Sequence, residues 1–93
     1  QKRDSIHEKR MNFKSDIDVR GMSGQEALES VMYFVEDAIQ CGAKRLSILH
    51  GTGTGYLRQV IRQYLNTVPA VASCHDEHVH FGGAGITIVE LAY

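Results

Sequence analysis

The order of hydrophobic and polar residues predicts a strand at the start of the regular pattern. Residues 13–20 place apolar side chains two or four positions apart, at Phe13, Ile17 and Val19, with polar residues between them. A period of two is typical of a strand with one buried face and one face in water. Gly21 interrupts the pattern, so we expect the strand to end there.

Two later segments follow the helical period instead. Ser23 and Glu26 have the spacing of a capping box, in which each side chain accepts a hydrogen bond from the other residue's backbone amide. Apolar residues then recur every three or four positions to about Gln40, and Gly42 can end the helix. A second helix is predicted between the glycines that end at residue 55 and Pro69, from an apolar stripe of Leu57, Val60, Ile61, Tyr64 and Leu65.

Three further segments read as strands, at residues 46–49, near 70–75 and at 86–91. The last is rich in β-branched residues, which favour strands. The order strand, helix, strand, helix, strand, strand predicts an α/β fold, namely a two-layer α+β sandwich with two helices on a four-stranded mixed sheet. We expect mostly parallel pairing through right-handed crossovers, with the last two strands antiparallel.

Composition narrows the class of protein. The 93 residues are 43% hydrophobic and 23% charged, as expected of one globular domain, and no apolar run approaches the roughly 18 residues of a membrane span. Residues 1–13 read as a charged linker from an upstream domain, with the domain itself at 14–93, so the chain reads as part of a longer protein. Two widely spaced cysteines indicate reduced thiols and a cytoplasmic location. The net charge of -1 argues against binding nucleic acid over a broad basic surface, so any phosphate site must be local.

A glycine-rich loop after His50 is the strongest candidate for a binding site. Gly51, Thr52, Gly53, Thr54 and Gly55 directly precede the second helix, where free backbone amides and the helix dipole can hold a phosphate. A tight turn is the alternative explanation, although a single turn rarely needs three glycines. The residues after the loop do not fit a P-loop or a dinucleotide fingerprint, so nucleotide binding is disfavoured.

Charged residues at the ends of two strands supply candidate chemistry. If those strands are parallel neighbours, Asp18, Arg20 and Gly21 lie at the same sheet edge as His50. His50 could transfer protons or brace the loop. Asp18 could orient a water, hold a divalent cation or pair with Arg20, and arginine can donate two hydrogen bonds to one phosphate.

Two other groups of residues are weaker candidates. Arg58 and Arg62, one turn apart on the second helix, could extend an anion site, but a solvated helix face is favoured. The histidines near Asp76 and Glu77 invite a metal site, yet they lack the spacing of a metal motif, so we assign no metal ligands.

Three stretches resemble the signature motifs of the Smr (small MutS-related) domain family: residues 17–21 (IDVRG), 50–55 (HGTGTG) and 82–91 (GGAGITIVEL). The first is most similar to the motif of the Smr domain at the C-terminus of the second bacterial MutS family. The resemblance covers residues 15–91. It implies a four-stranded sheet backed by two helices, as in the C-terminal domain of translation initiation factor three.

The resemblance also implies a function. Members bind nucleic acid, DNA or RNA, and an endonuclease activity that nicks phosphodiester bonds is attributed to the family. They associate with branched DNA in recombination and repair or with ribosomes in quality control, here as the end of a larger MutS-type ATPase. The alternative is a module that docks its parent protein on ribosomes or branched nucleic acid and does no chemistry.

Residue roles follow by position in the motifs. Asp18 matches the acidic residue of the family's Leu-Asp-x-His motif, and His50 with Gly51, Gly53 and Gly55 matches its His-Gly-x-Gly loop. Arg20 departs from the pattern, because many family nucleases carry a second histidine there. We expect the loop to hold a backbone phosphate, with Arg20 neutralising charge. Asp18 would orient a water or a cation such as Mg²⁺ or Mn²⁺, and His50 would shuttle the proton.

Overall fold

The computed structural model describes residues 13–93, so the charged linker predicted for residues 1–13 lies outside it except for Phe13. The predicted order of strands and helices is confirmed. The elements are β1 (Asp16–Asp18), α2 (Gly24–Gln40), β2 (Arg45–Leu49), α3 (Tyr56–Leu65), β3 (Val71–Asp76) and β4 (Ile86–Leu91), with short 3₁₀ turns at Val79–Phe81 and Gly83–Gly85.

The four strands form one mixed sheet in the order β1-β2-β4-β3. β1 pairs with β2 in parallel, whereas β4 is antiparallel to both β2 and β3. The mixed sheet and the antiparallel last pair are therefore confirmed. The expectation of mostly parallel pairing is wrong, because β4 returns between β2 and β3. The apolar strand β4 lies in the centre of the sheet, and the more polar strand β3 lies at its edge.

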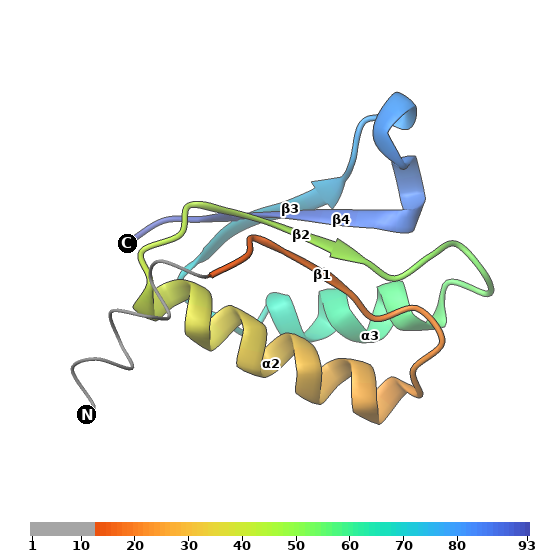
Figure 1. The fold of residues 1–93 in the computed structure, drawn as a ribbon, viewed down its shortest axis with the longest axis horizontal. Helices are drawn as coiled ribbons and strands as arrows, with labels where there is room; N and C mark the ends of the chain where they lie inside the picture. The colour runs from red at the N-terminus through yellow and green to blue at the C-terminus, as the bar shows by residue number, and fades with distance from the viewer. Residues whose placement is uncertain (1–12) are drawn as a thin grey trace.

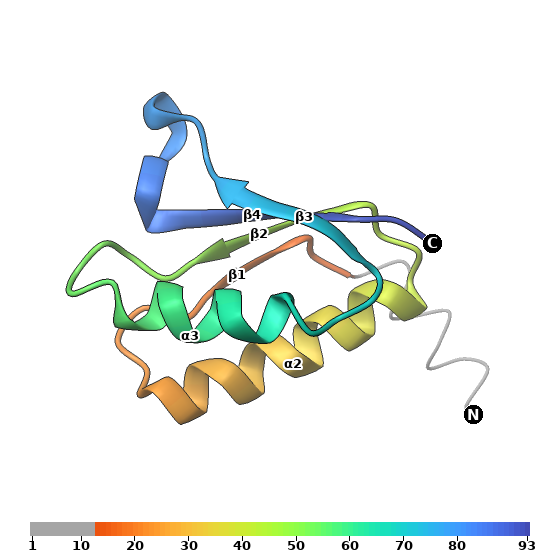
Figure 2. The ribbon, with the colours of Figure 1, turned by 180° about the vertical axis from the view of Figure 1, so that it is seen from behind.

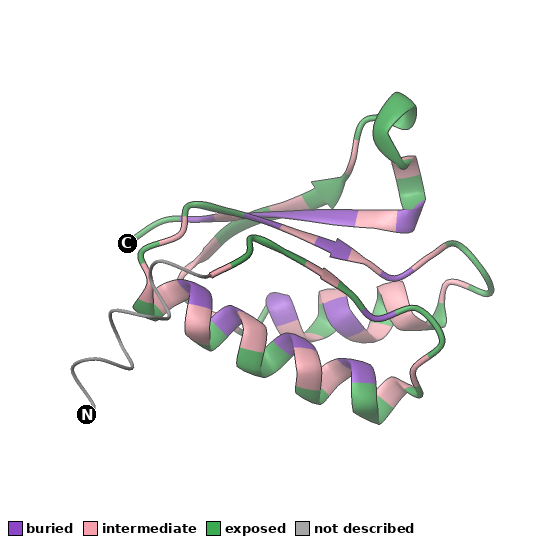
Figure 3. Cartoon of the chain, viewed as in Figure 1, coloured by how far each residue is buried: buried purple, intermediate pink, exposed green. Residues whose placement is uncertain are grey.

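Both helices cover the same face of the sheet, and the segment that joins β3 to β4 rises on the other side (Figures 1 and 2). The core lies between these two layers, and Figure 3 shows the buried positions of the helices facing the strands. Alternate residues of the two central strands enter this core. The buried core residues are Val19, Ala27, Val31, Val35, Ala38, Leu46, Ile48, Ile61, Leu65, Val89 and Leu91.

The start of α2 is fixed by the predicted capping box. The Glu26 amide donates to Ser23 Oγ over 3.2 Å, and the Ser23 amide donates to Glu26 Oε1 over 3.0 Å. Gly24, the first helical residue, lies directly against the Tyr56 ring, where a Cβ would come within 2.6 Å of Tyr56 Cε2. This contact brings the starts of α2 and α3 together beside the end of β1.

Phe13 stacks on Phe34 of α2, with ring centroids 5.7 Å apart.

Within residues 13–93, neither helix has the length and apolar character that crossing a bilayer requires.

Candidate functional site

The carboxyl ends of β1 and β2 meet at one edge of the sheet. Asp18 pairs with Leu49 in the parallel register, and the Val19 amide donates to the Leu49 carbonyl over 2.9 Å. The expectation that both strands end side by side is therefore confirmed. Residues after β1 and the loop after β2 lie next to each other at this edge.

The loop of residues 51–55, which we call the glycine loop, keeps part of its backbone free. The amide of Gly51 donates to the Gly85 carbonyl over 3.0 Å, and the amide of Gly55 donates to the Thr52 carbonyl over 2.9 Å. The amides of Thr52, Gly53 and Thr54 have no partner within residues 13–93. Free backbone amides are what an anion recognises in a loop that leads into a helix.

All three glycines of the loop adopt left-handed backbone angles, with φ of +80° at Gly51, +35° at Gly53 and +83° at Gly55. The conformation of the turn itself therefore requires each glycine. Contrary to the expectation from the sequence, this one turn needs all three glycines. Support for a ligand comes from the free amides and not from the glycine count.

A pocket of about 310 Å³ lies along the glycine loop. The start of α3 adds the amides of Leu57 and Arg58, which have no partner within the described residues, and contributes the partial positive charge of a helix N-terminus. The wall opposite comes from the start of α2. The lining residues are Met22, Ser23, Gly24 and the run from His50 to Arg58.

Asp18 and Arg20 form a forked ion pair at the end of β1. Arg20 Nε donates to Asp18 Oδ1 over 3.0 Å and Nη2 donates to Oδ2 over 2.8 Å, while the Arg20 amide also donates to Oδ1. These hydrogen bonds lower the pKa of Asp18 from 3.8 to about 2. Asp18 is thus ionised at neutral pH and is a weak base for proton transfer.

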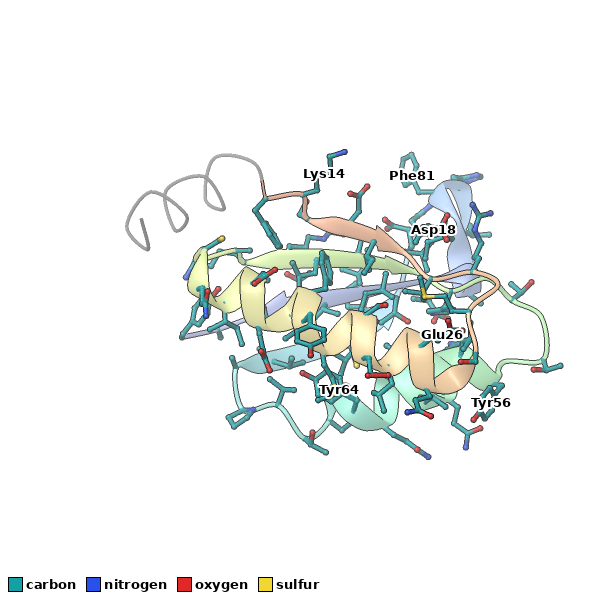
Figure 4. All side chains as sticks on the ribbon, turned by 60° about the horizontal axis from the view of Figure 1, so that its bottom comes forward. Lys14, Asp18, Glu26, Tyr56, Tyr64 and Phe81 are labelled. Carbon is teal, nitrogen blue, oxygen red and sulfur yellow. The ribbon has the colours of Figure 1, made fainter. Side chains whose placement is uncertain are left out.

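The Asp18 and Arg20 pair lies on a different side of the sheet from the pocket. Asp18 lines a hollow on the face without helices, together with Asp16, Ser47, Leu49 and Ile86. Figure 4 shows Asp18 on the side that carries Phe81, while Tyr56 lies by the glycine loop. The Arg20 stem nevertheless reaches the loop, because a Cβ on Gly51 would lie 3.6 Å from Arg20 Cγ.

His50 is buried, with only 5% of its surface exposed. Its Nδ1 lies 2.8 Å from the Gly51 carbonyl oxygen, and its Nε2 lies 2.8 Å from Thr87 Oγ1. Burial lowers the pKa of His50, and the nearby Arg62 and Arg58 add to this, although the Gly51 contact opposes it. The imidazole is therefore neutral at pH 7, with both nitrogens occupied.

Arg58 and Arg62 face β3 and share one carboxylate. Arg58 Nη2 and Arg62 Nη2 lie 2.9 Å and 2.6 Å from Asp76 Oδ1. Arg62 Nε also donates to Thr87 Oγ1 over 3.2 Å. The favoured interpretation of a solvated helix face is incomplete, because Arg62 is largely covered and connects α3 to the sheet.

The predicted site residues therefore form two groups. His50, the glycine loop and Arg58 line the pocket, whereas Asp18 and Arg20 bind each other outside it. Gly21, with φ of +81°, lies in the turn after β1 and does not line the pocket. The gathering of acid, arginine and imidazole in one pocket is not what the structure shows.

Three residues that the sequence argument did not assign to the site contact it. Gly85 accepts hydrogen bonds from the amides of His50 and Gly51, both over 3.0 Å. Thr87 binds the His50 ring, and Asp76 binds both arginines of α3. Gly85 and Thr87 belong to the third signature stretch, residues 82–91. That stretch reaches the glycine loop only because β4 pairs with β2, which the sequence did not predict.

The described residues do not fit a resident divalent cation. Both carboxylate oxygens of Asp18 already accept hydrogen bonds from Arg20. Within residues 13–93, no three His, Cys, Asp or Glu side chains are grouped to hold a metal ion. We therefore assign no step to a bound metal.

Comparison with known proteins gives the family. A model of the Smr domain matches residues 17–92, nearly all of the described chain. The chain belongs to the Smr domain family. The resemblance noted in the three signature stretches is thereby confirmed.

Relatives of this Smr domain include proteins named Endonuclease MutS2. That of Caldicellulosiruptor bescii is 42% identical over 83 residues, which are 89% of this chain and 10% of the relative. That of Caldicellulosiruptor saccharolyticus is 44% identical over 75 residues, 81% of this chain and 10% of the relative. The chain thus spans about a tenth of the length of these curated relatives.

Solved structures confirm the fold. The Smr domain of Thermus thermophilus MutS2 superimposes with a TM-score of 0.82 at 40% identity, covering 86% of this chain and 100% of that one. YdaL, a stand-alone small MutS-related protein from Escherichia coli, superimposes with a TM-score of 0.81 at 20% identity over 97% of this chain and 76% of its own. The second likeness shows the shared fold.

The lowered pKa of His50 predicts how the stability of this Smr domain depends on pH. The unfolded chain binds a proton at His50 near the ordinary value of 6.5, whereas the folded chain resists it. Because the unfolded state then holds more protons, we expect the free energy of unfolding to fall as the pH drops from about 7 to about 5. The paired carboxylates, such as Asp18, lose their contribution only at much lower pH.

Urea unfolding followed by circular dichroism measures this dependence. His50→Gln should flatten the curve between about pH 5 and pH 7. A wild-type free energy of unfolding that is constant over this range would contradict the assignment of a buried neutral imidazole.

Proposed function

We propose that this Smr domain binds the phosphodiester backbone of a nucleic acid at the glycine loop and hydrolyses a phosphodiester bond there. The observation that carries the proposal is the set of free amides of Thr52, Gly53 and Thr54, continued by those at the start of α3. Such amides recognise phosphate oxygens without reading base sequence. The names of the relatives support nuclease chemistry.

Arg20 is the group best placed to stabilise the reacting phosphate. In hydrolysis a water oxygen bonds to phosphorus, the bond to one sugar oxygen breaks, and a proton from the water passes, through solvent, to that leaving oxygen. Negative charge develops meanwhile on the other phosphate oxygens. The Arg20 stem lies against Gly51, and Asp18 holds its Nε and Nη2. Nη1 has no partner within residues 13–93, so it can donate to a phosphate at the mouth of the loop.

His50 supports the loop in this proposal. Proton transfer by His50 stays a prediction, and it would require the ring to break its contact with Gly51 or Thr87. Asp18 acts through Arg20, which it orients.

The site must work without a basic surface around it. Residues 13–93 contain six lysines and arginines against nine aspartates and glutamates. Affinity would then come from a few local contacts, and binding should fall only moderately as salt rises, since few counterions are released. A domain that binds only proteins or small neutral ligands would show no salt-dependent affinity for nucleic acid.

We further propose that the domain belongs to a larger cytoplasmic MutS-type ATPase that it directs to DNA or RNA. The support is that the relatives named MutS2 are about eight to nine times as long as this chain. Branched DNA, in recombination or repair, and the ribosome, in quality control, are the partners that this assignment suggests.

Adding a negative charge to the glycine loop tests the binding site. Gly53 has a left-handed φ of +35°, which aspartate and asparagine tolerate better than other residues, and a Cβ there meets no atom within 4 Å. Gly53→Asp should weaken binding of a fluorescent single-stranded oligonucleotide by about tenfold or more, because its carboxylate repels the phosphate. Gly53→Asn has the same shape without the charge and is the matched control.

Fluorescence anisotropy at two salt concentrations measures these affinities. Equal affinity of Gly53→Asp and Gly53→Asn would place the nucleic acid elsewhere on the domain.

One observation favours a second function, docking on nucleic acid without cleavage. No ionisable side chain of the described residues is ready to accept a proton from water at the loop, since Asp18 is held by Arg20 and His50 is buried. Incubation with supercoiled plasmid and with structured RNA, with Mg²⁺ and with a chelator, separates the two functions. Binding that is sensitive to Gly53→Asp, with no cleavage of either substrate, would support docking.

A further inference from the structure

Thr87 connects His50, which precedes the glycine loop, to Arg62 of α3. It is fully buried in β4, its hydroxyl accepts a hydrogen bond from Arg62 Nε, and it lies 2.8 Å from His50 Nε2. We infer that Thr87 is a positioning residue, which fixes the imidazole of His50 and through it the conformation of the glycine loop. This inference concerns the site described above and rests on the proposed function for its consequence in binding.

The contacts of His50 determine which ring nitrogen carries the proton. A carbonyl oxygen can only accept a hydrogen bond, so the short contact with the Gly51 carbonyl requires a proton on Nδ1. In the neutral ring Nε2 is then an acceptor, and the Thr87 hydroxyl must donate to it. Thr87 can do so because its oxygen accepts from Arg62 with a lone pair and keeps its hydrogen for His50.

The orientation of Thr87 is itself determined by the sheet. Asp76 of β3 is the register partner of Thr87 of β4, so both side chains reach the helix layer side by side. Arg62 donates to both of them. A chain of hydrogen bonds thus runs from Asp76 through Arg62 and Thr87 to His50 and ends at the Gly51 carbonyl.

The same chain holds the glycine loop at both ends. At the start of the loop, the imidazole of His50 binds the carbonyl of Gly51, and the Gly51 amide donates to the Gly85 carbonyl. At the end of the loop, where α3 begins, Arg58 and Arg62 of the first turns donate hydrogen bonds to Asp76 of β3. A loop with fixed ends keeps its three free amides oriented before a ligand arrives, which lowers the entropy lost on binding.

Two substitutions separate the hydroxyl from the shape of the side chain. Thr87→Val keeps the size and removes the hydroxyl, which leaves the buried Nε2 without a donor. Thr87→Ser restores the hydroxyl. Thermal unfolding identifies the temperature range in which both variants are folded, and the measurements below are made within it.

Nitrogen-15 NMR of the His50 ring gives a readout that a purely structural role would not change. In the wild type we expect the neutral form with the proton on Nδ1. In Thr87→Val we expect the titration of His50 to move to higher pH, because the neutral ring loses a hydrogen bond. The amide signals of Thr52, Gly53 and Thr54 should shift or broaden in Thr87→Val and stay close to wild type in Thr87→Ser.

Oligonucleotide affinity measures the functional consequence. We expect a loss of about tenfold in Thr87→Val and a change of no more than about twofold in Thr87→Ser. A wild-type His50 with the proton on Nε2, or Thr87→Val with ring and loop signals like those of the wild type, would overturn the inference. The wild-type domain could bind no oligonucleotide while Thr87→Val still changes the ring and loop signals as expected. That result would contradict the proposed function and leave the positioning role supported.

Discussion

Replacing Arg20 with alanine is expected to lower the rate of phosphodiester cleavage by about 100- to 1000-fold, the usual loss when one donor to a developing oxyanion is removed. Arg20 is the charged side chain whose stem lies against the glycine loop, and its Nη1 is free to donate. Its positive charge stabilises the transition state more than the bound substrate, because negative charge builds up on the phosphate during the reaction. The rate of cleavage should therefore fall much more than the affinity for substrate.

Single-turnover cleavage of a labelled substrate, with affinity measured in parallel, tests this prediction. Arg20→Lys should recover little activity, because lysine keeps the charge but lacks the planar guanidinium whose Nη1 is free to donate to the phosphate. Arg45→Ala is the matched control, since Arg45 is also an exposed arginine in ion pairs, with Glu77 and Glu90. Equal rates in Arg20→Ala and Arg45→Ala would remove Arg20 from the reaction.

Asp18→Asn should have a smaller effect than Arg20→Ala in the same assay. The ion pair is exposed, and solvent screens such pairs strongly, so Arg20 can still reach the phosphate without its partner.

The helices and strands could be predicted from the sequence because their signals are local. The capping box at Ser23 and the apolar stripes determine both helices over a few turns of chain. The pairing of the strands is not a local property. The apolar run 86–91 gives a strand wherever it lies, and its antiparallel position between β2 and β3 follows from burial of both its faces, which the pattern alone does not reveal.

The same limit applies to the candidate site. The glycine loop and the parallel ends of β1 and β2 could be placed from sequence, because two parallel strands joined by a helix end at the same edge of the sheet. Thr87, which binds the His50 ring, lies 37 residues further along the chain and reaches it through the unexpected position of β4. Side-chain alternation then sends His50 to the helix side and Asp18 to the open side, so these two residues do not share a pocket.

The division has a functional consequence. The chain of hydrogen bonds that supports the loop runs through the buried residues His50 and Thr87 on the helix side of the sheet. The Asp18 and Arg20 pair is exposed and can adjust to a substrate. Binding should therefore depend on Thr87 and the loop, and catalysis on Arg20, so that variants of the two groups change different kinetic parameters.

Ile48→Ala is expected to lower the free energy of unfolding by about 2–5 kcal/mol, the usual cost of a cavity at a fully buried isoleucine. Ile48 lies in the central strand β2 on the helix side and has no exposed surface, whereas its neighbour Leu49 points to the open face and is half-buried. Leu49→Ala removes the same number of carbons and should cost less than half as much. Urea unfolding of both variants measures the difference, and equal losses would mean that the sheet is covered on both faces. Small domains have only about 5–15 kcal/mol in total, so Ile48→Ala should also loosen the glycine loop that β2 carries.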